Sequence, residues 1–308
     1  MDTTIYKEPT VESRLVLRRQ LNWLAVEVIL LLVCFGRPLY DLLRFTNHSD
    51  LFSYIPLVPF ISAYLIWTER KQITTEVRPC RIGAACAFIA GACIAAIGWF
   101  ATRPGSTLDV QDYLALMTLS FLLFFWGACL ALLGSKIMRD AAFPFLFLIL
   151  AVPMPSAWDA NVRTFLQYAS AYAAEMFFKL VGTPVSLVDL QMNLPNFGIV
   201  VAPECSGIHS TVVLFITSLL AAYLFLRRAW TRAILVLAVL PLAILRNGFR
   251  IWVIGELCVH VNHNMIDSPI HRKGGPVFFA LSLIPFLLLL VFLRKRDFNP
   301  SKTDLSST

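Results

Sequence analysis

Long apolar runs separated by short polar segments dominate the chain. An α-helix needs about 20 apolar residues to cross the hydrocarbon core of a bilayer, and eight runs approach or exceed that length. They cover residues 22–43, 51–67, 82–102, 112–134, 141–155, 205–226, 230–257 and 274–293. The run at 141–155 ends at Pro153 and Pro155 and is short, so that tilt or neighbouring protein has to complete it. The pattern predicts an all-α polytopic membrane protein with about eight transmembrane helices.

One region departs from this pattern. Residues 156–181 combine charged, small and aromatic residues in a way that is typical of an amphipathic helix at a membrane interface. Residues 182–204 are rich in Val, Leu, Pro, Gly and Asn and partly alternate, which favours short strands or an extended loop. We therefore expect a small extramembrane cap at about 156–204, made of an amphipathic helix and a short β segment.

Basic residues predict the orientation. Because Lys and Arg concentrate in cytoplasmic loops, the segments that hold most of them are expected on the cytoplasmic side. This places both termini inside, as tails at 1–21 and 294–308 around an integral membrane domain at 22–293, and the cap at 156–204 outside. Most of the 26 Lys and Arg residues lie at 7–19, 70–81, 136–139, 227–232 and 294–302.

Composition supports the membrane class. Hydrophobic residues make up 58% of the chain, charged residues make up 15%, and the mean hydropathy is +0.71. A soluble helical protein would need polar faces on most of its helices, and these runs lack them. We assign the net charge of +7 to cytoplasmic loops, so the expected partner is the lipid bilayer and not nucleic acid.

The seven cysteines include no CxxC pair, and most lie in apolar runs, where cysteine acts as a small hydrophobic residue. Cys205 differs because it opens a run, within PECSGIHS at 203–210. The backbone N–H groups and dipole at a helix start favour a thiolate, although the charge of Glu204 opposes this. Gly207 is expected to leave room for a substrate backbone. Cys205 is therefore a candidate nucleophile, and a buried structural cysteine is the alternative.

Two arginines lie inside the seventh run, in LRNGFRI at 245–251. Arg246 and Arg250 are four residues apart and share a helical face, with Asn247 between them in sequence. Ionisable residues at membrane depth are rare and mark functional sites. Snorkelling to the surface explains one arginine near a helix end. Two arginines with an asparagine favour a cluster that handles an anion.

His271 lies in SPIHRKGG at 268–275, in the predicted outer loop before the last run. An imidazole changes charge near neutral pH and suits acid–base catalysis, whereas the alternative is an ordinary solvated histidine. The predicted topology places Cys205, Arg250 and His271 at the same membrane face. His209 follows Cys205 by four residues, so we expect it on the same helical face, as a rival partner for the thiol.

A metal site is a further hypothesis. His260, His263 and His271 could ligate zinc, but the sequence specifies no fourth ligand and no known zinc spacing. No phosphate-binding loop is evident either. We therefore predict no metal and no cofactor.

At these residues the chain resembles the exosortase and archaeosortase family of membrane transpeptidases. The resemblance runs from LFSYIPLVPFISAYLIW through FPFLFLILAVPMP to the last apolar run. Its specific part is an ordered set: Cys-Ser-Gly at 205–207, Asn-x-x-Arg at 247–250, and His271. The family frequently has Arg where His209 stands and a small residue where Arg246 stands.

The resemblance implies a cysteine peptidase and transpeptidase of the bacterial inner (plasma) membrane. Its substrates would be exported proteins that end in a Pro-Glu-Pro-like motif (PEP-CTERM), a transmembrane helix and a basic tail. Cys205 would attack the scissile carbonyl and form a thioester, Arg250 would stabilise the charge, and His271 would transfer the proton. An acceptor amine or hydroxyl would then resolve the thioester. Four further residues are candidates for auxiliary roles at the catalytic site: His209, Arg246, Asn247 and Glu204.

Two other functional classes stay open from the sequence. A non-proteolytic acyl or glycan transferase, or a transporter linked to exopolysaccharide export, could use the same cavity and should tolerate loss of Cys205. A catalytically silent scaffold should process substrate unchanged when any one of the three residues is replaced.

Overall fold

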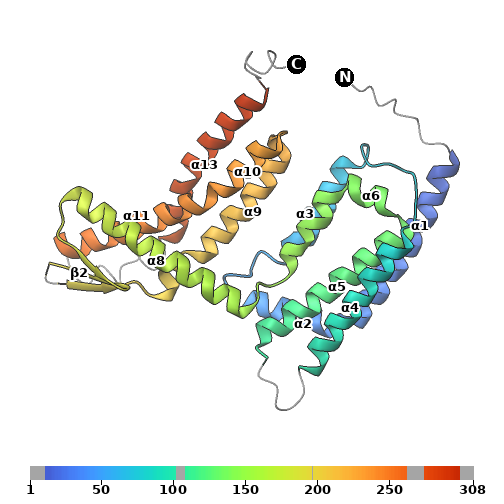
Figure 1. The fold of residues 1–308 in the computed structure, drawn as a ribbon, viewed down its shortest axis with the longest axis horizontal. Helices are drawn as coiled ribbons and strands as arrows, with labels where there is room; N and C mark the ends of the chain where they lie inside the picture. The colour runs from blue at the N-terminus through green and yellow to red at the C-terminus, as the bar shows by residue number, and fades with distance from the viewer. Residues whose placement is uncertain (1–10, 102–107, 196, 262–273, 299–308) are drawn as a thin grey trace. The chain divides into compact units, whose positions relative to one another are not determined.

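A computed structural model describes residues 11–101, 108–195, 197–261 and 274–298. The chain is mostly helical and divides into two compact units, Met1–Ser156 and Ala157–Thr308 (Figure 1). In the described part of the chain, five helices are long and apolar enough to cross a membrane, and up to seven if each of two bent pairs forms one span. The predicted class of an all-α polytopic membrane protein is confirmed.

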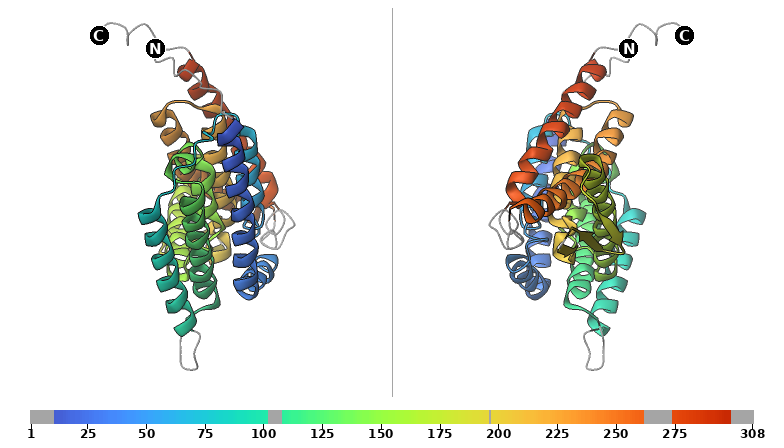
Figure 2. Two further views of the ribbon diagram at one scale, coloured as in Figure 1. Left: turned by 90° about the vertical axis from the view of Figure 1, so that its right-hand side faces the viewer. Right: turned by 90° about the vertical axis from the view of Figure 1, so that its left-hand side faces the viewer.

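The first unit is a set of helices built around α5. Its elements are α1 (Val11–Cys34), α2 (Gly36–Asn47), α3 (Leu57–Glu69), α4 (Arg81–Phe100), α5 (Val110–Leu132), α6 (Ser135–Asp140), α7 (Ala142–Phe147) and the 3₁₀ turn η1 (Leu148–Ala151). Figures 1 and 2 show α1, α4 and α5 side by side. The hydroxyl of Ser120 on α5 donates to the carbonyl of Gly91 on α4 at 2.8 Å. A glycine here lets the two backbones approach, as small residues do between membrane helices.

Three of the predicted spans in this unit differ from the structure. The run at 22–43 is not one helix, because the chain bends by 71° between α1 and α2. Pro38 lies in the first turn of α2, where a residue without an N–H is tolerated. In the middle of one continuous helix the same proline would remove a backbone hydrogen bond and break the helix. The run at 51–67 contributes only the 13 residues of α3 after a series of turns, and the run at 141–155 contains α7 and η1.

The second unit contains α8 and the remaining elements. They are α8 (Ser156–Val181), β1 (Ser186–Val188), β2 (Gln191–Leu194), β3 (Phe197–Val200), the 3₁₀ turn η2 (Pro203–Ser206), α9 (Ile208–Phe225), α10 (Ala229–Leu237), α11 (Val239–His260) and α13 (Gly275–Phe298). The predicted helix at 156–181 and the short strands after it are confirmed. The three strands form an antiparallel sheet in the order β1-β2-β3, with Met192 opposite both Leu187 and Ile199.

The sheet buries one face against helices of its own unit. Met192 and Ile199 from the sheet share an apolar cluster with Ala174 and Phe178 of α8 and Ile251 of α11. Burying a large side chain such as Phe178 stabilises the fold by about 1.5–3 kcal/mol. This cluster fixes α11 beside the segment that leads from β3 to η2.

Glycines allow α8 and α11 to pack closely. A Cβ atom added to Gly248 would lie 2.6 Å from the Cβ atom of Ala173, and one added to Gly255 would lie 2.4 Å from the ring of Phe178. Neither distance is sterically acceptable, so larger residues would push the helices apart. The backbone of Arg250, which lies between these two glycines, is therefore held at a fixed position relative to α8.

Candidate functional site

Cys205 lies in a turn and not in a long helix. The 3₁₀ turn η2 contains Cys205, whose backbone N–H donates to the carbonyl of Ala202 at 2.8 Å. Gly207 then adopts a left-handed conformation with a φ of 70°, and α9 begins at Ile208. The prediction that Cys205 occupies the first turn of the helix is therefore wrong. The local cause is Gly207, because a left-handed residue interrupts the right-handed path between the two elements.

Two side chains of α11 hold this turn from the other side. The amide nitrogen Nδ2 of Asn247 donates to the carbonyl of Cys205 at 2.6 Å, and Nη2 of Arg246 donates to the carbonyl of Gly207 at 3.2 Å. Asn247 is 2% exposed and Arg246 is 8% exposed. These two bonds tie the backbone on both sides of Ser206 to α11, and the carbonyl of Gly207 also accepts the backbone N–H of Thr211 at 3.1 Å.

Only a glycine at position 207 leaves space for Asn247 and Arg246 to approach the turn. A Cβ atom at position 207 would lie 2.9 Å from Oδ1 of Asn247 and 3.0 Å from Nη2 of Arg246. The side of Gly207 that a side chain would occupy is thus filled by α11, and the expectation that this glycine leaves room for a substrate backbone is wrong. Both its left-handed backbone and its close neighbours require glycine.

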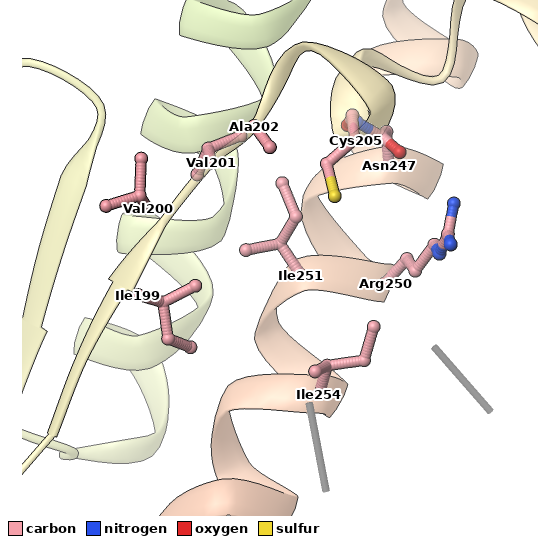
Figure 3. A pocket seen from close by; sticks show the side chains of 9 residues that line it. All are labelled: Ile199, Val200, Val201, Ala202, Cys205, Asn247, Arg250, Ile251 and Ile254. Carbon is pink, nitrogen blue, oxygen red and sulfur yellow. The ribbon is translucent and has the colours of Figure 1, made fainter. Parts of the chain in front are cut away.

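Cys205 and Arg250 line one cavity of about 150 Å³. Figure 3 shows the sulfur atom pointing into the space between Ile251 and Arg250. The rest of the wall is mostly apolar and comes from Asn247, Ile251, Ile254 and the segment 199–202. In such surroundings the effective dielectric constant is lower than in water, so a fixed positive charge acts more strongly on a neighbouring anion. The arrangement can stabilise a thiolate or an oxyanion.

Comparison with protein-family models gives a match to the transmembrane exosortase family (Exosortase_EpsH) over residues 44–288. The chain belongs to this family. Comparisons with curated proteins and with solved structures give no match. Membership confirms the resemblance seen in the sequence and implies a membrane transpeptidase role in protein sorting.

The other sequence-predicted residues of this exosortase fall at different places. His209 is an exposed residue of α9, whereas Cys205 lies in η2 before the left-handed Gly207, so the prediction that the two share a helical face is wrong. The backbone of Glu204 is part of η2. His271 lies outside the described residues. The structure thus brings Cys205 and Arg250 together and does not bring His209 into their cavity.

The proposed histidine metal site is only partly described. His260 is exposed, and its Nε2 lies 3.0 Å from Oε2 of Glu256. The other carboxylate oxygen of Glu256, Oε1, accepts a hydrogen bond from the hydroxyl of Thr183. His263 and His271 lie outside the described residues. Within the described ranges, no group of three or more His, Cys, Asp or Glu side chains could hold a metal ion.

Gln167 is a supporting residue of the exosortase that the sequence analysis missed. It is a buried residue of α8, and its Nε2 donates to the carbonyl of Val201. The bond holds the end of the segment between β3 and Cys205. A signal was present, because Gln167 interrupts an apolar stripe formed at helical spacing by Ala171, Ala174 and Phe178. A buried polar residue in such a stripe usually has a specific partner.

Proposed function

We propose that this exosortase is a cysteine transpeptidase that cleaves C-terminal sorting signals of exported proteins. The observation that carries the proposal is the shared cavity of Cys205 and Arg250, beside a turn that Asn247 holds in place. A positive charge close to the thiol stabilises both the thiolate and the oxyanion that forms from it. An arginine supplies this charge throughout the reaction, because it does not lose its proton. The substrates would carry a Pro-Glu-Pro-like motif, a transmembrane helix and a basic tail.

The reaction has two transfers. The thiolate of Cys205 forms a bond to the scissile carbonyl carbon, and its negative charge moves to the carbonyl oxygen, beside Arg250. As the oxyanion collapses, the peptide C–N bond breaks, and the amine takes a proton from His271 and leaves with the helix and tail. An acceptor amine or hydroxyl then attacks the thioester, gives its proton to His271 and releases the thiolate. Neither transfer requires a redox change.

Trapping the thioester tests this proposal. Hydroxylamine is a strong amine nucleophile, so adding it to membranes with a tagged sorting-signal substrate should convert the cleaved product into its hydroxamate. Mass spectrometry of the new C-terminus measures this product. Cys258→Ala, which removes a buried thiol from α11, should give the same hydroxamate as the wild-type protein. Cleavage that proceeds without any hydroxamate would contradict an acyl-enzyme intermediate.

The topology forms part of the proposal. We propose cytoplasmic tails at 1–21 and 294–308, a membrane domain at 22–293, and a cap at 156–204 on the outer face of the inner membrane. Reporter fusions after residue 135 and at the C-terminus should be active only in the cytoplasm, whereas a fusion at residue 190 should be active only outside. The charge distribution of the loops is the reason for this expectation. A cytoplasmic residue 190 would place the sheet on the wrong side for exported substrates.

A comparison of two histidines tests the proton transfer. His271→Ala should slow substrate conversion by about 10²–10⁴-fold, the usual contribution of a general acid or base. His209→Ala should have little effect, since His209 is exposed and does not line the cavity. Both variants are measured at equal protein amounts in membranes. An inactive His209 variant beside a normal His271 variant would reverse the assignment.

A further inference from the structure

The strand β3 pairs with a neighbour on one side only. The sheet has the order β1-β2-β3, so β2 covers one side of β3, and no strand of the described chain covers the other side. We call this second side the open edge of β3. Water has to surround such an edge, because unpaired backbone groups are too costly in the hydrocarbon of a bilayer. The open edge is therefore accessible to a ligand in the aqueous phase.

The pairing register shows which residues form the open edge. The backbone N–H of Val201 donates to the carbonyl of Leu190 at 2.9 Å. Along an antiparallel pair, residues whose backbone groups bond to the partner strand alternate with residues whose groups point away from it. The backbone groups of Ile199 therefore point toward β2, and those of Gly198 and Val200 point to the open edge. Both of these residues are exposed, and no other described residue forms a hydrogen bond with their backbone groups.

The open edge leads to the candidate nucleophile. Val200 and Ala202 line the cavity of about 150 Å³ together with Cys205. Figure 3 shows the chain running from Val200 through Ala202 to the turn that carries Cys205. The sheet has a second outer strand, β1, but no residue of β1 lines this cavity. Of the two outer strands, only β3 therefore brings a bound ligand to the thiol.

The chemistry of the edge restricts what can bind there. Every second residue of a strand presents an N–H and a carbonyl on the same side, about 7 Å from the next such pair. An acyl chain has no donor or acceptor for these groups, and an α-helix has already bonded its own backbone groups internally. An extended peptide has free backbone groups at the same repeat and adds to a sheet edge as a further strand. The ligand that fits is an extended peptide.

We propose that the Pro-Glu-Pro-like motif of the substrate binds as a fourth strand along the open edge of β3. This inference rests on the proposed transpeptidase function. Backbone groups two residues apart point to the same side of a strand, so both prolines of the motif lack an N–H on one side. The glutamate between them points its N–H and carbonyl to the opposite side, where they pair with Val200. The proline nitrogens then face away from β3, as a sheet edge requires.

A change in the peptide backbone tests this pairing. A labelled synthetic peptide with the motif is bound to full-length Cys205→Ala protein in nanodiscs, so that affinity is measured without turnover. Replacing the amide of the motif glutamate by an ester removes its N–H and should weaken binding about fivefold, the effect of one hydrogen bond. An ester placed far before the motif, beyond the reach of β3, should leave the affinity unchanged.

A change in the protein tests the other partner of the same bond. Val200→Pro removes an N–H from the open edge and leaves the bonds between β2 and β3 in place, so peptide affinity should fall about tenfold. Leu187→Pro is the matched control. Leu187 lies opposite Met192, whose backbone groups point to β3, so the N–H of Leu187 points away from the sheet at β1. This variant should bind the peptide as the parent protein does.

The outcomes separate the binding mode from the reaction. Equal affinity of the amide and ester peptides, or full affinity in Val200→Pro, would overturn the fourth strand. A protein dimer that Val200→Pro dissociates would overturn it too, because a second copy of the chain would then occupy the edge. Hydroxamate formation without any ester effect would refute the binding mode and keep the transpeptidase reaction. An ester effect without hydroxamate would refute the acyl-enzyme and support the binding mode.

Discussion

Cys205→Ala is expected to abolish substrate conversion, with a loss of more than about 10³-fold. The substitution removes the only atom that can form the thioester in the proposed route, while the turn keeps its backbone hydrogen bonds to Ala202 and Asn247. The cysteine is only partly buried, so loss of its sulfur costs little packing. Conversion of a tagged sorting-signal substrate in membranes, at equal protein amounts, measures the effect.

A matched control is Cys258→Ala, which removes a buried cysteine from the same unit and should keep normal activity. Cys205→Ser should be nearly as inactive as Cys205→Ala, because a serine hydroxyl is a much weaker nucleophile than a thiolate at neutral pH. Substantial turnover by Cys205→Ala would favour the alternative of a non-proteolytic transferase or transporter, which does not need the thiol.

Arg250→Lys is expected to slow conversion by about 10²–10³-fold, as the loss of one donor to an oxyanion does. Lysine keeps the positive charge but loses the planar fork and the reach of the guanidinium. Arg250 lines the cavity with Cys205, and in the proposed mechanism its guanidinium stabilises the oxyanion of the reacting carbonyl. The same membrane assay measures the loss, and kcat should fall more than KM rises if the contact forms mainly in the transition state.

Arg246→Lys is the matched comparison, one helical turn away. In the structure Arg246 uses Nη2 for the carbonyl of Gly207, whereas its buried Nη1 has no hydrogen-bond partner. A single ammonium group can replace that one bond and keeps the positive charge beside the carbonyl of Gly207, so the loss should stay below about tenfold. If Arg246→Lys is the more damaging change, the roles of the two arginines are reversed.

Several features of the fold could be predicted because hydropathy is a local property. The helices α4, α5, α9 and α13 lie within a few residues of the predicted apolar runs, and α8 and the strands match the predicted polar interruption. The ordered set of Cys-Ser-Gly at 205–207, Asn-x-x-Arg at 247–250 and His271 was sufficient to indicate the family, which the match over residues 44–288 confirms. Their shared cavity was expected only from the predicted topology.

Other local predictions failed for physical reasons. The break after Cys34 was missed because residues 22–43 are apolar enough on average, although Pro38 and the charged residues of α2 favour a separate helix. The placement of Cys205 in a helix failed because a glycine can start a helix or end a turn, and sequence does not distinguish the two. The prediction that Cys205 and His209 share a helical face failed for the same reason.

The sequence by itself determined the membrane class, the approximate positions of most helices, and the set of candidate groups, because composition and spacing are sufficient for these. Only the tertiary structure decided how the groups are held. Asn247 reaches the carbonyl of Cys205 across 42 residues of chain, and Gly207 is required because Asn247 and Arg246 occupy the space beside it. Such contacts depend on how closely α11 packs against η2 and the start of α9 in three dimensions, and no pattern along the chain encodes that distance.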